Sequence, residues 1–423
     1  MIDYNTRLLY TMKYFGGLSM RYRFRMKEAV DGGILDGAVQ KTMVRYPYLM
    51  KKVAVIDGKY VLLDNPLPVP VIKTVYPMPE FGSEKLNEHL VVVDYEGNDI
   101  YVTMSHNLGG GRGLYNWSFS ILYQYVTDRY GTDPGWEGIR RADTPPLPGE
   151  EMIQPFDHIP DVPAKWHGFP EEVKPILPSE VEKAMAEDKP EGSYMTVIRL
   201  DSETVMERVK ALHASPAVWF AVIYYKALLS TIKKIPDYTD MGVTCDVSDQ
   251  FGCTESMSLV TKFLHLVYTR EDADSDMETL CQKGRALLKQ QRDPGATAEQ
   301  YKKERDTLIS MEKLDGIEEK AKYYLAHSLI ADMVPSALVS YVGNYDIPGM
   351  DRYVDQYIVS GVCSTSGMII TAESGEFLLN IAHKYEDASI LSSIENELIK
   401  EGIVPLNEER NIDQNNVGII LPN

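Results

Sequence analysis

The chain has 423 residues, of which 44% are hydrophobic, 25% charged and 10% aromatic, so it is not a disordered, collagenous or coiled-coil protein. Its 62 acidic and 43 basic residues give a net charge of −19, which repels phosphate groups and excludes nucleic acid and anionic membranes as bulk partners. The length exceeds one typical core and favours two domains of about 200 residues each.

The first third of the chain alternates strand-like and helix-like patterns. Apolar residues at every second position predict strands, whereas apolar residues spaced three or four apart predict one face of a helix. Asp57-Gly58 and Glu96-Gly97-Asn98 are typical turns of hairpins. The expected elements are a strand at 18–27, a helix at 31–45, a hairpin of 51–57 with 59–63, a hairpin of 90–94 with 99–105, and a helix at 114–129.

A proline-rich stretch follows, in which residues 143–190 hold ten of the 24 prolines. Proline removes a backbone donor and disfavours helix in the residue before it, so this stretch is expected to be extended and irregular. A long segment of this kind usually joins two units. We therefore predict an N-terminal subdomain at 1–142, a connector at 143–192 and a C-terminal subdomain at 193–423.

The second half again mixes the two patterns. Asp201 and Ser215 are expected to cap helices, and Pro216 suits the first position of the second one. The expected elements are strands at 194–200, 257–268, 336–342, 353–361, 367–373 and 377–383, and helices after Asp201, from Pro216, and at 275–291, 313–332 and 388–401. Both halves therefore predict an α+β fold, in which helices pack on a mixed, mostly antiparallel sheet.

Cysteine and histidine spacing gives no sign of a disulfide scaffold or a metal site. None of the four cysteines forms a CxxC pair, and no HExxH or HxxxH pattern occurs. No apolar stretch reaches the ~18 residues of a spanning helix, and the first residues lack the pattern of a secretion signal. We expect a cytoplasmic monomer with reduced thiols and no metal.

The most specific passage lies at residues 101–113 and reads YVTMSHNLGGGRG. A predicted strand delivers His106 into a glycine-rich loop, and a predicted helix follows. A histidine at a strand end suits general-base chemistry, because its ordinary pKa lies near working pH. The pattern also fits a flexible turn with a surface histidine. The glycine run matches neither GxxxxGK[ST] nor GxGxxG, which argues against a nucleotide-binding loop.

The same passage resembles the HxxxDG motif of the CoA-dependent acyltransferase superfamily. This superfamily includes chloramphenicol acetyltransferase, alcohol acetyltransferases and the condensation domains of nonribosomal peptide synthetases. The run at 31–53 is similar to the family's helix, turn and strand, and the run at 340–345 resembles its late strand facing the catalytic tunnel. In this alignment the motif loop consists of Ser105, His106, Gly110, Gly111 and Gly113.

The resemblance implies two chloramphenicol-acetyltransferase-like halves that form a V-shaped pseudo-dimer with the active site in a tunnel between them. It implies that His106 deprotonates a hydroxyl or amine, which then attacks the carbonyl of an acyl thioester without a covalent enzyme intermediate. The oxyanion needs a hydrogen-bond donor, for which Ser340 is the candidate. Tyr341 and Asn344 are expected beside it in the tunnel.

The motif departs from the family pattern at two positions. Gly110 stands where the family has aspartate, and Ser105 stands where condensation domains have their first histidine. The family's aspartate is considered structural, because its salt bridge shapes the loop. Its replacement leaves open a different class of function, in which a protein of this fold binds ligands or acts as a scaffold without catalysis.

The distribution of charge favours one of two acyl donors. Residues 283–305 carry seven basic and three acidic side chains, and a CoA phosphate group requires such a patch. The candidates for phosphate binding are Lys283, Arg285, Lys289 and Arg292; the alternative explanation, which the spacing favours, is a solvated helix face. The acidic chain opposes docking of an acidic carrier protein. We therefore expect free acyl-CoA as co-substrate and no bound cofactor; the alternative is a free-standing condensation enzyme whose donor is a phosphopantetheine thioester on a carrier protein.

Overall fold

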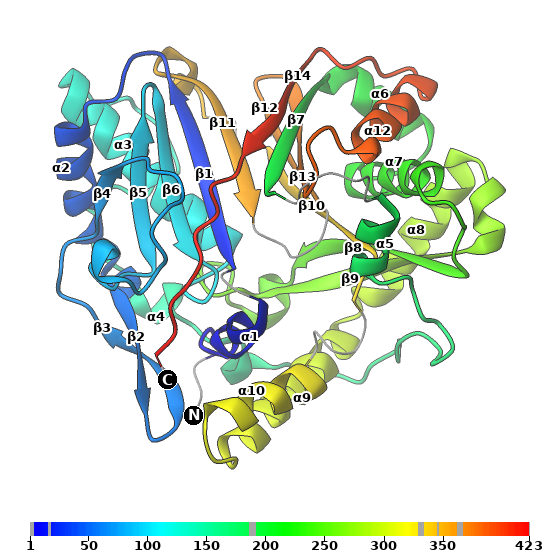
Figure 1. Ribbon diagram of the computed structural model, residues 1–423, viewed down its shortest axis with the longest axis horizontal. Coiled ribbons are helices and arrows are strands. Elements are labelled where there is room, and N and C mark those ends of the chain that lie inside the picture. Colours follow the sequence, from blue (N-terminus) through cyan, green and yellow to red (C-terminus); the bar gives the residue numbers. More distant parts are fainter. Residues whose placement is uncertain are drawn as a thin grey trace.

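The computed structural model describes residues 4–15, 18–185, 192–328, 334–344, 347–361 and 367–422. Two β-sheets lie side by side, and each carries helices on the face turned away from the other sheet (Figure 1). The predicted α+β class with two mostly antiparallel sheets is thus confirmed. Within the described residues, no helix is both long and apolar enough to cross a bilayer.

The first sheet has five strands in the order β11-β1-β6-β5-β4, and only β4 and β5 are parallel. Its strands are β1 (Ser19–Met26), β4 (Val71–Lys73), β5 (Val91–Glu96), β6 (Asp99–Ser105) and β11 (Val354–Gly361). Helices α2 (Gly32–Met43) and α3 (Gly111–Tyr130) pack on its outer face. The predicted hairpin of β2 (Lys51–Ile56) and β3 (Lys59–Asp64) forms separately, and Asp57 and Gly58 take the positive φ angles that its turn requires.

The second sheet has seven strands in the order β14-β7-β13-β12-β10-β8-β9. Its strands are β7 (Tyr194–Asp201), β8 (Tyr238–Asp246), β9 (Thr261–Thr269), β10 (Ala337–Asn344), β12 (Gly367–Glu373), β13 (Glu376–His383) and β14 (Asn407–Asp413). The helices on its outer face are α6 (Ser202–Ala211), α7 (Pro216–Thr231), α8 (Met277–Gln291) and α12 (Ser389–Lys400). The largest core lies between these layers, where α7 buries Trp219 and Phe220 completely.

The two halves exchange segments across the gap between the sheets. Strand β11 follows β10 of the second sheet in the chain but pairs antiparallel with β1 of the first sheet, with Tyr22 opposite Val359. After β14 the chain returns to the first half, where Ile419 forms a bridge with Phe81. Figure 1 shows this C-terminal segment in red, running down the front of the molecule beside β1. We call residues 414–422 the C-terminal strap.

A third core fills the space below the two sheets. Helix α1 (Arg7–Phe15) packs there against α10 (Ile317–His327), and α9 (Pro294–Glu312) lies beside them (Figure 1). The Arg7 guanidinium forms a buried ion pair with Glu304 at 3.4 Å. This pair fixes the N-terminal helix between the halves, close to the end of β6.

The proline-rich connector is fastened to the first half through one buried carboxylate. Glu151, at the end of α4 (Pro148–Glu151), is 1% exposed and forms ion pairs with Arg45 and Arg140. The Tyr48 hydroxyl donates to the same carboxylate. The backbone carbonyl of Glu151 also accepts a hydrogen bond of 2.8 Å from the Met257 amide. The connector therefore holds the segment at 257–259 in place.

The elements mostly match their predicted ranges, and the differences have physical causes. Helix α3 begins at Gly111 rather than at residue 114, and β9 begins at Thr261 rather than at residue 257, because residues 257–259 pack against the glycine loop instead of pairing in the sheet. The helix predicted at 313–332 is α10, and residues 329–333 lie outside the described part. The elements with no prediction are α1, β4, β8, α9 and β14. The connector was expected to be irregular throughout, but it contains the short helices α4 and α5 (Pro178–Met185).

Candidate active site

His106 directly follows Ser105, the last residue of β6. Its backbone amide still takes part in the hydrogen bonding between the strands. The Ser105 amide donates to the carbonyl of Leu90 at 2.9 Å, and the His106 amide donates to the carbonyl of Leu18 at 2.7 Å. The backbone of the histidine is therefore fixed by both neighbouring strands of the sheet. The predicted strand-to-loop position of His106 is confirmed.

The imidazole has one defined tautomer. Its Nδ1 atom lies 2.9 Å from the carbonyl oxygen of Gly109, and because a carbonyl oxygen can only accept, Nδ1 carries the proton. The lone pair of the neutral ring is then on Nε2. Burial lowers the pKa of His106 below its ordinary value, and the positive charge of Arg7 lowers it further. The ring is therefore neutral at pH 7, and its partly exposed side chain is suited to accept a proton at Nε2.

Ser105 has a structural role in the loop. Its side chain is 1% exposed, and its hydroxyl donates to Oδ1 of Asn107 at 2.5 Å. A side chain buried to this extent is out of reach of a substrate. The hydrogen bond instead fixes the turn that carries His106.

The glycines of the motif loop allow a second segment to approach the loop closely. A Cβ atom on Gly109 would lie 2.5 Å from the carbonyl oxygen of Met257, and one on Gly110 would lie 3.1 Å from Cα of Leu259. A Cβ atom on Gly113 would be 3.0 Å from the same Met257 oxygen. The Gly110 amide donates to that oxygen at 2.9 Å. Residues 257–259 thus occupy the space into which an aspartate at position 110 would extend.

An ion pair joins the same loop to the second sheet. Arg112, in the first turn of α3, contacts Asp246 at the end of β8 at 2.7 Å. Together with the hydrogen bond from Gly110, this contact holds the loop between the two halves. The loop is therefore firmly packed although it lacks the family's aspartate.

The packing predicts that Gly109→Ala is more harmful than Gly111→Ala. A methyl group at 109 meets backbone atoms that cannot move independently, and overpacking of this kind costs about 1–3 kcal/mol. A methyl group at Gly111 would have no other atom within 4 Å, and the residue has no positive φ, so its alanine variant should stay within about 0.5 kcal/mol of the parent. Urea denaturation measures both variants, and equal losses would contradict this account of the loop.

The residues expected on the late strand do not all share one face. Ser340 in β10 accepts a hydrogen bond of 2.8 Å from the Thr244 hydroxyl in β8, and Thr244 is two residues before Asp246, the partner of Arg112. Tyr341 points to the other face, where its ring lies 6.3 Å from that of Phe377 in the helix-covered core. The Asn344 side chain lies outside the described part of the structure.

The four candidates for phosphate binding do not all lie on one surface. Lys283 is turned inward and forms an ion pair with Asp272 at 2.5 Å. Arg285, Lys289 and Arg292 are exposed and lie four and three residues apart, at the spacing of one helix face. Arg285 in addition donates to the backbone carbonyl of His213. The structure thus brings three of the four together on α8 and its C-cap.

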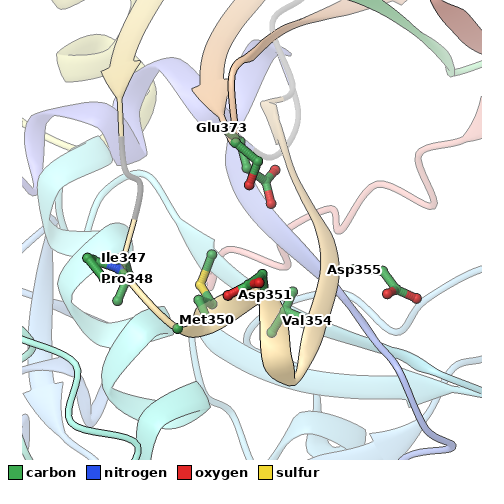
Figure 2. A pocket seen from close by; sticks show the side chains of 9 residues that line it. Ile347, Pro348, Met350, Asp351, Val354, Asp355 and Glu373 are labelled. Atoms are coloured by element: carbon green, nitrogen blue, oxygen red, sulfur yellow. The ribbon is translucent and has the colours of Figure 1, made fainter.

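A hollow of about 220 Å³ lies at the start of β11, away from His106 in the fold. Figure 2 shows the carboxylates of Asp351, Asp355 and Glu373 around it, together with the side chains of Met350 and Val354. Its acidic lining opposes the phosphate groups of a CoA donor. Within the described residues, no group of three or more His, Cys, Asp or Glu side chains is arranged to hold a metal ion.

Two contributors to the site were not predicted. Arg7 belongs to a helix that the apolar pattern did not reveal, and its effect on His106 depends on the fold of α1 between the halves. Residues 257–259 were assigned to a strand, and their contact with the glycine loop joins positions about 150 residues apart. The four loop glycines were the available signal, because glycine often marks a close backbone approach.

No protein-family model and no curated protein sequence matches the chain. Solved structures match it over nearly its whole length. The epimerization domain from the third module of tyrocidine synthetase B matches 95% of this chain with 94% of its own, at 12% identity and a TM-score of 0.57. Polyketide synthase associated protein 5 from Mycobacterium tuberculosis matches 93% with 95% of its own, at 11% identity and a TM-score of 0.57.

TRI101 of F. graminearum matches 92% of this chain with 97% of its own, at 12% identity and a TM-score of 0.56, and it has also been solved in complex with coenzyme A and deoxynivalenol. At such low sequence identities, the structural similarity to these proteins establishes only a shared fold. The chain shares the two-subdomain fold of these three solved structures, as the motif resemblance implied.

Proposed function

We propose that this protein is an acyltransferase that moves an acyl group from an acyl-CoA thioester to a hydroxyl or amine of a small molecule, with His106 as general base. The observation that carries the proposal is the bond from His106 Nδ1 to the Gly109 carbonyl, which leaves Nε2 free to accept a proton. The fold supports it, since TRI101 of F. graminearum with this fold binds coenzyme A. The Gly110 packing supports it against a binding-only role, because the loop is held firmly.

The reaction needs only groups of this chain and the two substrates. Nε2 of His106 takes the proton from the acceptor hydroxyl or amine as the oxygen or nitrogen attacks the thioester carbonyl. The tetrahedral oxyanion collapses, the carbon–sulfur bond breaks, and the thiolate takes the proton back from Nε2. Ser340 is the proposed oxyanion donor, because its oxygen accepts from Thr244 and its own hydroxyl proton is therefore available.

The described thiols support direct transfer rather than an acyl-cysteine intermediate. Burial raises the pKa of Cys245, and it raises the pKa of Cys253 to about 11 and that of Cys281 to about 12. All three remain protonated at pH 7, and a protonated thiol is a poor nucleophile. Cys363 lies outside the described residues.

We propose free acyl-CoA as the donor, with its phosphates against Arg285, Lys289 and Arg292. These side chains lie at the spacing of one helix face, and phosphates accept charge-assisted hydrogen bonds from such groups. The chain's net charge of −19 opposes an acidic carrier protein. A carrier-bound phosphopantetheine donor is the second candidate, favoured by the likeness to the epimerization domain of a peptide synthetase.

The lowered pKa of His106 predicts the pH dependence of transfer. Only the neutral imidazole is a base, and burial together with the charge of Arg7 keeps it neutral below its ordinary pKa of 6.5. We therefore expect kcat/KM to stay high at neutral pH and to fall only as the pH drops below about 6.5. Thiol release from acyl-CoA between pH 5 and 8 measures this profile, and a midpoint above pH 7 would contradict it.

A further inference from the structure

The ion pair of Arg112 with Asp246 lies where the two halves of the molecule meet beside the motif loop. Arg112 is in the first turn of α3 and follows His106 by six residues, and Asp246 is the last residue of β8 in the second sheet. The guanidinium lies 2.7 Å from the carboxylate. The pair therefore connects the loop that carries the proposed base directly with a strand of the other half.

Strand β8 also carries the partner of the proposed oxyanion donor. Thr244 and Asp246 are two positions apart on the same face of this strand, a separation of about 7 Å. The parallel pairing of β8 with β10 places Thr244 beside Ser340, and the Thr244 hydroxyl donates to the Ser340 oxygen at 2.8 Å. Both side chains are half-buried rather than sealed from solvent. One face of β8 thus contacts Ser340 at one position and the motif helix at the next.

The chain beyond Asp246 joins the motif loop to β8 a second time. Residues 247–260 leave the second sheet after Asp246 and return to it at β9, which pairs with β8. This excursion brings Met257 to the glycine loop, where its carbonyl accepts a hydrogen bond of 2.9 Å from the Gly110 amide. The ion pair and this hydrogen bond therefore fix the loop against the same part of the second half.

The ion pair restricts geometry more than it stabilises the fold. Its two side chains are 37% and 44% exposed, and exposed ion pairs add little to the free energy of unfolding. The Ser248 amide donates to the other oxygen of the Asp246 carboxylate at 2.8 Å, so the second half fixes the position at which the guanidinium binds. A shift of a catalytic group by about 1 Å can lower the rate about a hundredfold.

We propose that Arg112 and Asp246 are positioning residues for acyl transfer, which hold His106 of the first half at a fixed distance from Ser340 of the second half. The base acts on the acceptor that attacks the thioester carbonyl, and the oxyanion donor acts on the oxygen of that same carbonyl. Both can act together only when the halves are correctly spaced. This inference rests on the proposed function and deepens it, because it names residues that act through the loop and not on the substrates.

Three variants test the inference by steady-state kinetics: Arg112→Gln, Asp246→Asn and the two changes combined. Asp246→Asn removes the charge but keeps the oxygen that accepts from Ser248. We expect each single change to lower kcat about tenfold and to leave KM for acyl-CoA unchanged. Because both changes remove the same interaction, the double variant should lose no more than either single variant. Thermal midpoints should stay within about 2 °C of the parent.

Arg270→Gln is the matched control. Arg270 contacts Asp237 at 2.6 Å, and the two side chains are 50% and 77% exposed. This pair has the same chemistry, but both of its residues belong to the second half, so the variant should keep the parent's kcat. An unchanged kcat in either single variant or additive losses in the double variant would overturn the inference. So would a loss that falls on KM for acyl-CoA, since Arg112 would then bind the donor directly.

Hydrogen exchange measures the positioning without any substrate. In Arg112→Gln the backbone amides of residues 106–113 should exchange about threefold faster than in the parent, whereas Arg270→Gln should leave their rates unchanged. Unchanged exchange in Arg112→Gln would overturn the inference, whether or not the protein releases thiol. Faster exchange in a protein that releases no thiol from any acyl-CoA would contradict the proposed function but support the role of the pair in holding the loop.

Discussion

Replacement of His106 by alanine is expected to lower kcat for acyl transfer by about 10²- to 10⁴-fold, the range found for loss of a positioned general base. The loss should fall on kcat with little change in KM for acyl-CoA, because Nε2 acts on the acceptor proton in the transition state. Thiol release from acyl-CoA in the presence of an acceptor measures both constants.

Two checks separate a catalytic from a structural effect of this substitution. His167→Ala removes a histidine whose side chain is 74% exposed, and it should leave kcat unchanged. Added imidazole should restore part of the activity of His106→Ala, because the small base can enter the space left by the ring. An alanine variant that keeps the parent's kcat, at unchanged thermal stability, would remove His106 from the mechanism.

The second large effect concerns stability. Glu151→Gln is expected to lower the free energy of unfolding by about 3–5 kcal/mol, since it leaves the buried guanidinium of Arg45 without its charged partner. The side chains of Arg45 and Glu151 are only 2% and 1% exposed, so water cannot replace the lost carboxylate. Because the Glu151 backbone holds Met257, we also expect weaker packing of residues 257–259 on the motif loop.

Glu255→Gln is the matched control for this prediction. Glu255 binds the same Arg140 at 2.7 Å, but its side chain is 57% exposed. Exposed ion pairs contribute between about 0 and 1 kcal/mol. Urea denaturation of the two variants compares them directly, and similar losses for both would show that burial of the Arg45–Glu151 pair does not determine its contribution.

Much of the first half could be predicted because its signals are local. Asp31 caps α2 through the amides of Gly33 and Ile34, and Asp57-Gly58 forms its turn with the φ angles that this pair favours. The motif around His106 combines a strand, a glycine loop and a helix within thirteen residues. Such features depend on neighbouring residues and can be recognised without knowledge of the fold.

The missed elements depend on distant partners. Strand β14 reads NEERNID and has no apolar alternation; it exists because it pairs with β7 at the edge of the second sheet. Helix α1 is fixed by α10 and by the buried pair of Arg7 with Glu304. Gly110 was interpreted as the loss of a structural aspartate, whereas Leu259 of another segment fills that space. Contacts between segments so far apart cannot be read from one sequence.

The central claim is direct acyl transfer, and simultaneous measurement of free thiol and product mass tests it most directly. The protein is incubated with a panel of acyl-CoAs, alone and with small alcohols and amines, and thiol, acylated acceptor and intact protein are quantified together. The account predicts thiol release only with an acceptor, one acylated acceptor per thiol, and no mass added to the protein. An acyl group retained covalently on the protein, or no transfer from any acyl-CoA that it binds, would contradict it.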